Sequence, residues 1–207
     1  MRFHRMPALI PVLFSDLVWR IKDPMERCVY LTFDDGPMRG PTDFVLDQLS
    51  GFSAKATFFC IGDNIRKHPE AYQRILSEGH QVGNHTFRHL NGWSVKASQY
   101  YSDILECESV IGSAHSALLF RPPFGKLHPS YRQILPHMKI IMWDILSCDY
   151  DPTLNPQKAL SKIQGLTRPG SIVVFHDSLK AEKNLRSILP AYLRFLQSEG
   201  YALKSIK

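Results

Sequence analysis

The fold is decided by the stretch Val29-Tyr30-Leu31-Thr32-Phe33-Asp34-Asp35-Gly36-Pro37. Its first five residues favour β structure and lack polar alternation, which predicts a strand buried on both faces, as in a parallel sheet. Gly36-Pro37 cannot continue a strand, so the chain turns there. Asp34 and Asp35 therefore lie at the carboxyl end of a buried strand, where α/β folds place their chemistry. Because adjacent carboxylates repel, they require a metal, a cation or a shared proton.

The rest of the chain alternates apolar runs with segments of helical spacing, which predicts βα units and a mostly parallel sheet. The predicted strands span residues 29–33, 56–61, 81–84, 117–120, 139–143, 171–175 and 201–206, and the longest predicted helices span 93–111 and 184–199. Parallel strands bring their carboxyl ends to one edge, so distant residues converge there. No repeat or linker interrupts the 207 residues. We therefore expect a single domain over 1–207, with 1–27 as an N-terminal extension packed on it.

Composition excludes some classes of protein. The net charge is +6, but no run of Lys or Arg is longer than two, which argues against nucleic-acid binding. The cysteines lack the C-x-x-C spacing of a zinc ribbon and are typical of small core residues. They are Cys28, Cys60, Cys107 and Cys148.

The first 18 residues have some features of a signal peptide, with Arg2 and Arg5 before an apolar segment from Pro7 to Phe14. That segment is short, contains Pro11 and is not followed by a small-x-small cleavage site, so we expect it to belong to the fold. No stretch approaches the ~18 apolar residues of a membrane-spanning helix. We expect a monomer and take the cytoplasm as the default location, with association with the cell envelope left open.

A second motif, His85-Thr86-Phe87-Arg88-His89, also follows a predicted strand. Histidines at positions i and i+4 share one face of a helical turn and can present two imidazoles to one metal. Taken alone the spacing is equally typical of an exposed or structurally satisfied pair. Two histidines and one carboxylate form a known catalytic zinc set with open positions for water and substrate. Such a site polarises a carbonyl and lowers the pKa of water to about 7.

Three further motifs follow later strands. Arg121, in Arg121-Pro122-Pro123-Phe124-Gly125, is presented from a stiff loop, and a pairing with an aspartate of the first motif would keep that carboxylate ionised. Asp149, in the segment 143–151, can orient a catalytic histidine and raise its pKa. His176, at the end of Val173-Val174-Phe175-His176-Asp177, is placed to protonate a leaving amine. Each motif alone also suits a plain structural role, as a turn, a cap or a core histidine.

In this order, the five motifs resemble those of the polysaccharide deacetylase family, which is the NodB-homology domain or carbohydrate esterase family four. The matching segments are 32–37, 85–89, 121–125, 143–150 and 174–177. The resemblance implies a distorted (β/α) TIM-like barrel with seven parallel strands. It also implies hydrolysis of an N-acetyl group on an amino sugar with one divalent metal.

By matching position, the resemblance implies a role for each motif residue. The implied metal ligands are Asp35, His85 and His89, and the implied catalytic groups are Asp34 as base, Arg121 as its partner, His176 as acid and Asp149 as the group that tunes it. The residue types alone do not decide which aspartate of the pair is the ligand. A backbone N–H near Pro37 or Met38 is expected to stabilise the oxyanion.

Substrate-binding residues are expected around this centre. Tyr150 stands where the family commonly has Trp, and its ring can still stack on a sugar. Phe124 and Lys180 are the other candidates, and Lys180 belongs to a polar loop at 178–184 that we interpret as a rim element. Two histidines and an aspartate favour zinc, with cobalt or another divalent ion left open.

The sequence therefore predicts a metal-dependent hydrolase that removes N-acetyl groups from an amino-sugar polymer or oligomer such as peptidoglycan or chitin. Two alternatives stay open at this point. One is a metal-dependent amidase that acts on a non-sugar amide, and the other is a catalytically inactive carbohydrate-binding relative. A glycosidase is disfavoured, because the carboxylates accompany a metal-type histidine pair and no opposed acid is evident.

Overall fold

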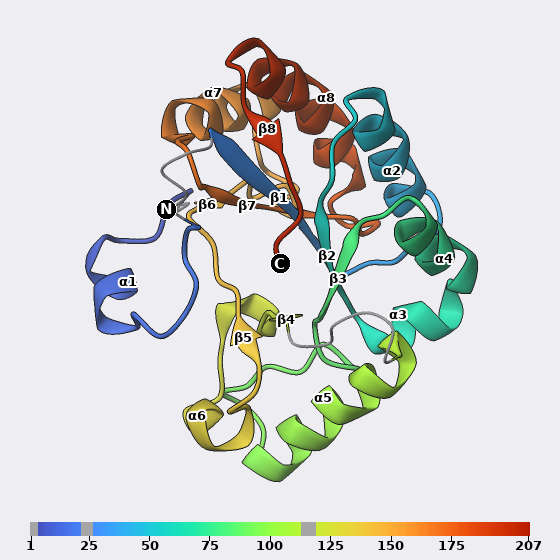
Figure 1. Cartoon of the computed structure of the whole chain (residues 1–207), viewed down its shortest axis with the longest axis vertical. Helices are drawn as coiled ribbons and strands as arrows, with labels where there is room; N and C mark the ends of the chain where they lie inside the picture. Colours follow the sequence, from blue (N-terminus) through green and yellow to red (C-terminus); the bar gives the residue numbers. More distant parts are fainter. Residues whose placement is uncertain (1–3, 22–26, 113–118) are drawn as a thin grey trace.

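The computed structural model describes residues 4–21, 27–112 and 119–207. Its strands curl into a distorted barrel with most of the helices on the outside (Figure 1). The strand order is β5-β4-β3-β2-β1-β7-β6, with β8 paired to β1 beside this path, and neighbouring strands run parallel. The strands are β1 (Cys28–Asp34), β2 (Thr57–Cys60), β3 (Gln81–Asn84), β4 (Leu119–Phe120), β5 (Lys139–Ile140), β6 (Ile145–Leu146), β7 (Ile172–His176) and β8 (Ala202–Leu203). The predicted barrel is confirmed.

The path contains seven strands, as predicted, but their membership differs from the prediction. The predicted last strand is β8, which lies beside the path, and the seventh strand of the path is β6, which the sequence did not reveal. The predicted fifth strand, 139–143, forms a ladder only over Lys139–Ile140. Residues 117 and 118 of the predicted fourth strand lie outside the described residues.

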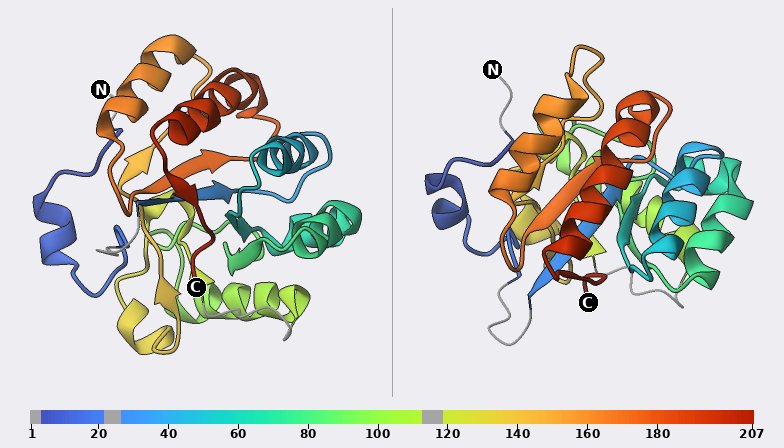
Figure 2. Two further views of the ribbon diagram at one scale, coloured as in Figure 1. Left: turned by 45° about the horizontal axis from the view of Figure 1, so that its top comes forward. Right: turned by 90° about the horizontal axis from the view of Figure 1, so that it is seen from above.

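The helices pack outside the strands and connect them in sequence order (Figure 2). They are α1 (Leu9–Leu13), α2 (Pro41–Gly51), α3 (Gly62–Lys67), α4 (Pro69–Ser77), α5 (Ala97–Ile111), α6 (Tyr131–Ile134), α7 (Pro156–Leu166) and α8 (Glu182–Ser198), with a 3₁₀ turn η1 (Pro123–Gly125). Proline opens α2, α4 and α7, where its missing N–H is not needed. The predicted start of α5 at Trp93 is wrong: Asn91 holds residues 91–94 in a turn by accepting the N–H groups of Trp93 and Ser94.

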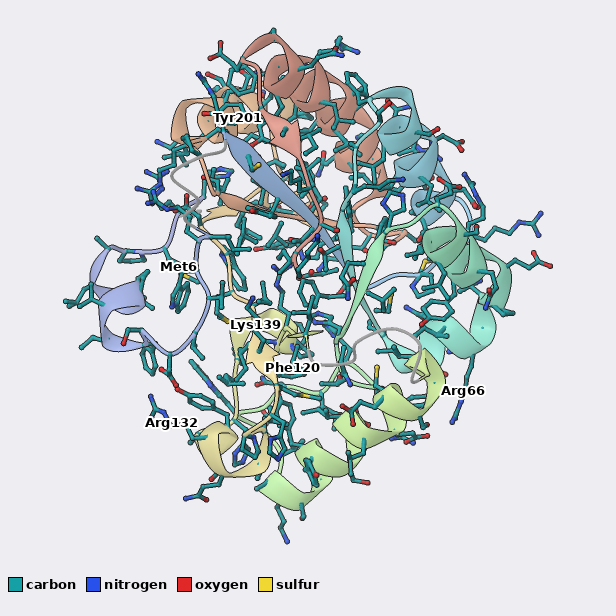
Figure 3. The ribbon with its side chains drawn as sticks, viewed as in Figure 1. Met6, Arg66, Phe120, Arg132, Lys139 and Tyr201 are labelled. Atoms are coloured by element: carbon teal, nitrogen blue, oxygen red, sulfur yellow. The ribbon has the colours of Figure 1, made fainter. Side chains whose placement is uncertain are left out.

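Both faces of β1 are buried, as its apolar run predicts. Val29, Leu31 and Phe33 belong to the cluster packed beneath the helices, whereas Tyr30 belongs to the cluster inside the barrel. Side chains fill this interior around Phe120 (Figure 3). Because side chains alternate along a strand, Asp34 continues the inward series that includes Tyr30. The alternation therefore directs Asp34 into the carboxyl-end mouth of the barrel.

Residues 4–21, here called the N-terminal strap, connect the two ends of the strand path. Val18 forms a parallel bridge to Ile141 just after β5, at one end of the path, and Arg5 forms an antiparallel bridge to Ile145 in β6, at the other end. Arg20 forms an antiparallel bridge to Ser171, just before β7. The Val18 N–H donates to the Ile140 carbonyl at 2.9 Å. No described helix combines the length and the apolar character that crossing a membrane requires.

We predict that Gly170→Ala destabilises the protein by loosening the strap. Gly170 has φ +82, and an added Cβ would lie 2.0 Å from the Ile21 carbonyl oxygen. The Ile21 N–H also donates to the Gly170 carbonyl at 3.0 Å. Left-handed strain and weakening of this contact together are expected to lower the free energy of unfolding by roughly 2–4 kcal/mol, measured by urea denaturation.

Gly165→Ala is the matched control. Gly165 lies in α7, and its added Cβ meets nothing within 4 Å. Because alanine is the better helix former, this variant is expected to be neutral or more stable by up to about 1 kcal/mol. Equal free energies of unfolding for the two variants would contradict a stabilising close contact between Gly170 and Ile21 of the strap.

Candidate metal centre and active site

A cavity of about 490 Å³ opens at the carboxyl ends of the strands. Its lining is Asp34, Asp35, His85, His89, Pro122, Phe124, Gly125, Trp143, Leu146, Tyr150, Val174, His176 and Lys180. Eight of the twelve residues predicted for the site are in this set. Arg121 and Asp149 are fully buried and contact the lining residues Asp34 and His176. Pro37 and Met38 are not among the described lining residues.

The three predicted metal ligands converge. Asp35 Oδ1 lies 3.2 Å from His89 Nε2 and 3.7 Å from His85 Nε2. The candidate ligand atoms of all three residues lie within 4.8 Å of one another. Asp35 and His89 both have left-handed backbones, with φ of 78 and 57, a conformation that is uncommon outside glycine and often marks functional sites.

A hydrogen bond fixes the tautomer of His85. Its Nδ1 lies 2.7 Å from the Arg121 carbonyl oxygen, which can only accept, so Nδ1 carries the proton and Nε2 keeps a free lone pair toward Asp35. Burial lowers the pKa of His85 to about 4. Burial acts to raise the pKa of Asp35, but a hydrogen bond to His89 and the neighbouring histidines outweigh it and hold that pKa well below its usual range. At neutral pH both groups are thus in their metal-binding forms.

This donor set fits a divalent metal. Two imidazole nitrogens and one carboxylate suit zinc or cobalt better than magnesium or calcium, which prefer oxygen ligands. The set also leaves coordination positions on the cavity side for water and substrate.

Asp34 is held by Arg121. Arg121 Nη1 donates to Asp34 Oδ1 at 2.7 Å, and the two side chains are nearly or completely buried. The same Nη1 lies 2.7 Å from Thr32 Oγ1, and the other guanidinium nitrogens donate to the carbonyls of Ile141 and Met142 at 3.0 Å. The predicted ion pair is therefore present, and it fixes the position of one Asp34 oxygen.

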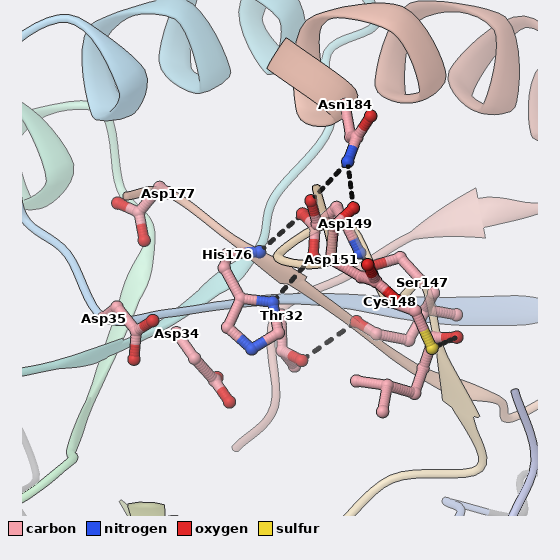
Figure 4. A network of polar contacts seen from close by, with 12 residues as sticks. Thr32, Asp34, Asp35, Ser147, Cys148, Asp149, Asp151, His176, Asp177 and Asn184 are labelled. Atoms are coloured by element: carbon pink, nitrogen blue, oxygen red, sulfur yellow. Dashed lines mark hydrogen bonds and ion pairs between the residues drawn. The ribbon is translucent and has the colours of Figure 1, made fainter. Parts of the chain in front are cut away.

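Asp34 and His176 are direct register partners on β1 and β7. The ladder thus sets their backbones about one strand spacing apart, roughly 4.8 Å. His176 Nδ1 lies 2.7 Å from Asp149 Oδ1, and the His176 N–H donates to Asp149 Oδ2 at 2.9 Å (Figure 4). His176 lines the cavity. Because its Nδ1 is bonded to Asp149, Nε2 is the ring nitrogen available to a ligand there.

Asp149 also sets the charge of His176. Burial lowers the pKa of His176, but the charge of Asp149 and its hydrogen bond, with smaller effects of Asp35 and Asp34, raise it to about 9. Asn184 supports this arrangement from α8 by donating to the carbonyls of Asp149 and Asp151 at 2.8 and 2.9 Å (Figure 4). His176 is therefore protonated at neutral pH, as a general acid requires.

Asp177 is a buried carboxyl that the sequence analysis did not assign. It accepts the Gly36 N–H at 3.1 Å and the Thr42 hydroxyl at 2.6 Å, and its own N–H donates to the Asp34 carbonyl at 3.1 Å. A Cβ on Gly36 would lie 2.0 Å from Asp177 Oδ2. Asp177 therefore joins the loop that follows β1 to the end of β7. The available signal was its place directly after His176.

The same network involves one of the backbone N–H groups expected to stabilise the oxyanion. Proline has no N–H, and the Met38 N–H donates to Thr42 Oγ1 at 2.7 Å. The Met38 amide is thus used within its own loop. The predicted substrate-binding residues Phe124, Tyr150 and Lys180, by contrast, do line the cavity.

We predict that Asp177→Asn changes how the stability of the metal-free protein depends on pH. Burial, with a smaller effect of Asp35, raises the pKa of Asp177 to about 8. An unfolded aspartate titrates near 3.9, so between about pH 4 and 8 the folded state retains a proton that the unfolded state releases, and stability falls as pH rises. Asparagine has no such proton.

The free energy of unfolding in urea should be compared at pH 5 and pH 9. The wild type is expected to lose at least about 1.4 kcal/mol relative to Asp177→Asn over this range, the equivalent of one pKa unit. If the free energies of unfolding of the wild type and Asp177→Asn differ by the same amount at pH 5 and pH 9, the raised pKa of Asp177 is disproved.

The comparisons with known proteins agree with this geometry. A family model described as polysaccharide deacetylase matches residues 21–143. The chain is 27% identical over 186 residues to peptidoglycan-N-acetylmuramic acid deacetylase PdaC of Bacillus subtilis, which covers 89% of this chain and 39% of that protein. It is 29% identical over 197 residues to a peptidoglycan-N-acetylglucosamine deacetylase of Bacillus cereus, which covers 92% and 91% of the two chains.

Among solved structures, the Bc1960 peptidoglycan N-acetylglucosamine deacetylase superposes with a TM-score of 0.87 at 25% identity over 95% of this chain and 94% of that one. The chain spans well under half the length of the B. subtilis relative, but nearly all of the B. cereus relative. Because the family model matches more than half of the sequence, the chain belongs to the polysaccharide deacetylase family.

Proposed function

We propose that this protein is a metal-dependent hydrolase that removes N-acetyl groups from an amino-sugar polymer or oligomer of the peptidoglycan or chitin kind. The observation that carries the proposal is the register pairing of Asp34 with His176 beside the Asp35, His85 and His89 cluster. It supports the proposal because the groups proposed as base, acid and metal ligands all line one cavity. The names of the relatives, which are peptidoglycan and chitooligosaccharide deacetylases, support the same substrate class.

A divalent metal, which we propose to be zinc with cobalt as the alternative, would polarise the acetyl carbonyl and acidify a water when bound to Asp35, His85 and His89. Asp34 accepts the proton of the attacking water, and Arg121 orients Asp34 through their ion pair. His176 Nε2 donates its proton to the sugar nitrogen as the C–N bond breaks, and Asp149 stabilises the imidazolium through Nδ1. The products are acetate and the free amine.

The walls of the cavity suit a sugar better than a small flexible amide. Tyr150 and Phe124 present rings on the lining, and these rings lie 5.0 and 4.5 Å from those of His176 and His89. Aromatic faces beside the reacting centre are typical of sites that bind a flat, amphipathic ligand. The non-sugar amidase is the second candidate.

An inactive role is less well supported. The BA3943 protein of Bacillus anthracis, described as a family pseudoenzyme, shares the fold at a TM-score of 0.78 and 23% identity. The fold therefore does not imply activity. Here Arg121 contacts the proposed base Asp34, and Asp149 contacts the proposed acid His176.

The first prediction tests the reaction. Metal-stripped protein should release acetate from N-acetylglucosamine oligomers or peptidoglycan fragments only after zinc or cobalt is added. Asp34→Asn should lower kcat by about 10²–10⁴-fold, the usual contribution of a general base. Its metal content should match that of the wild type, because Asp34 is not a proposed ligand, whereas His85→Ala should lose metal.

Release of acetate that does not depend on added metal, or full activity in Asp34→Asn, would contradict the mechanism. Acetate release from small amides but from no sugar would favour the second candidate.

The second prediction concerns pH. Because a general acid must be protonated, kcat/KM should fall as pH rises through the pKa of His176, which is about 9. Asp149→Asn removes the anion that stabilises the imidazolium of His176. The pH at which kcat/KM falls should therefore move lower by at least about one pH unit. Asp151→Asn removes a nearby carboxylate that accepts hydrogen bonds from Thr153, and in this variant the pH at which kcat/KM falls should stay near that of the wild type. Equal shifts in both variants would show that Asp149 has no specific role.

A further inference from the structure

One flank of the cavity presents an aromatic ring with a lysine beside it. Tyr150 and Lys180 both line the cavity, and Lys180 Nζ lies 5.6 Å from the centroid of the Tyr150 ring. The Tyr150 ring in turn lies 5.0 Å from His176. This pair is therefore adjacent to the group proposed to protonate the leaving amine.

A second pair of the same kind lies outside the cavity lining, in the two loops that carry His89 and Phe124. Lys126 Nζ lies 5.5 Å from the centroid of the Trp93 ring, and the Trp93 side chain is 68% exposed. Lys126 follows Phe124 by two residues, and the Phe124 ring packs on His89 at 4.5 Å. Trp93 itself follows His89 by four residues, so about 14 Å of chain at most separates them.

The Trp93–Lys126 pair is held in place. Trp93 Nε1 donates to the Leu127 carbonyl at 3.0 Å. A Cβ on Gly92 would lie 2.4 Å from the Lys126 carbonyl oxygen, so the backbones of the two loops are in close contact. The exposed indole is thus a fixed feature of the rim.

Neither lysine has a carboxylate partner among the described residues. Other cations of this surface do: Arg88 pairs with Asp103 at 2.7 Å, and Arg186 pairs with Glu182 at 2.7 Å. An exposed ring offers an apolar face, and an unpaired ammonium offers a point charge for an anion. The two pairs therefore add positive charge beside His176 and in the loop that carries Phe124, around a centre that contains Asp34 and Asp35.

We propose that the Tyr150–Lys180 and Trp93–Lys126 pairs select N-acetylated glycans that carry carboxylate groups over neutral glycans. The proposal rests on the proposed function, because it assigns the substrate class of the same cavity. Each ring stacks on a sugar, and each ammonium binds a carboxylate of that sugar or of a peptide attached to it.

The test compares substrates that differ only in charge. Peptide-free peptidoglycan strands carry carboxylates on the sugar, and the same strands with those carboxylates converted to methylamides are the neutral counterpart. Strands that retain their peptides form a third arm, which separates sugar carboxylates from peptide carboxylates. The readout is the ratio of kcat/KM for native strands to kcat/KM for amidated strands, with zinc-loaded protein.

The wild-type ratio is expected to be about ten. Lys180→Gln and Lys126→Gln should each lower it about threefold, which is the contribution of a partly exposed ion pair, and the double variant should bring it near one. Lys162→Gln, which removes an exposed lysine on α7 that belongs to neither pair, should leave the ratio unchanged. A wild-type ratio near one, or equal effects of all three single variants, would overturn the proposal.

A binding measurement separates this proposal from the proposed function. Quenching of Trp fluorescence in zinc-loaded Asp34→Asn reports affinity for the same strands without turnover. Tighter binding of native than of amidated strands, lost in the lysine variants, would support the charge selection even if no substrate released acetate. Equal binding of the two kinds of strand would reject the selection even if deacetylation were observed.

Discussion

The active end of this barrel depends on one buried ion pair. Arg121 is completely buried, lies over the ring of Phe59 at 4.1 Å and donates to Asp34 at 2.7 Å. A guanidinium that is buried away from solvent is tolerable only when its donors are satisfied, and here they bond to Thr32 and Asp34 of β1 and to the carbonyls of residues 141 and 142 after β5. The pair therefore joins three segments, and it fixes where the carboxylate that faces the cavity can sit.

The catalytic groups are held in two different ways. The proposed base and acid lie on neighbouring strands and are positioned by ladder hydrogen bonds, so their spacing belongs to the sheet. The proposed ligands Asp35 and His89, and the rim residue Phe124, lie in left-handed backbone conformations within loops. Rigid strands thus set the spacing of the proposed base and acid, whereas strained loops orient the groups proposed to bind metal and substrate.

Much of this was predictable, for identifiable reasons. The unbroken apolar run before Asp34 predicts a doubly buried strand, and parallel strands oblige the motif residues to meet at one edge. The sequence did not reveal β6 because a strand of two residues is too short to show an alternating pattern of apolar and polar side chains. Asp177 was missed because a polar residue after a strand is usually a cap, and only the structure reveals its bonds to Gly36 and Thr42. The bond from the Met38 N–H to Thr42 was also not predictable, because the sequence does not show which acceptor a backbone N–H finds.

The N-terminal strap has a consequence for how the molecule assembles. It leaves the ribosome before the residues that it bonds to, and its contacts with them are very distant in sequence: Arg5 meets the Leu166 carbonyl across 161 residues. Contacts of such long range form late, because the intervening chain must first be ordered. The nascent protein must therefore keep this apolar segment unpaired until β7 has been made. Until the strap has packed, the part of the barrel that the strap covers would expose the interior of the incompletely folded chain to other molecules.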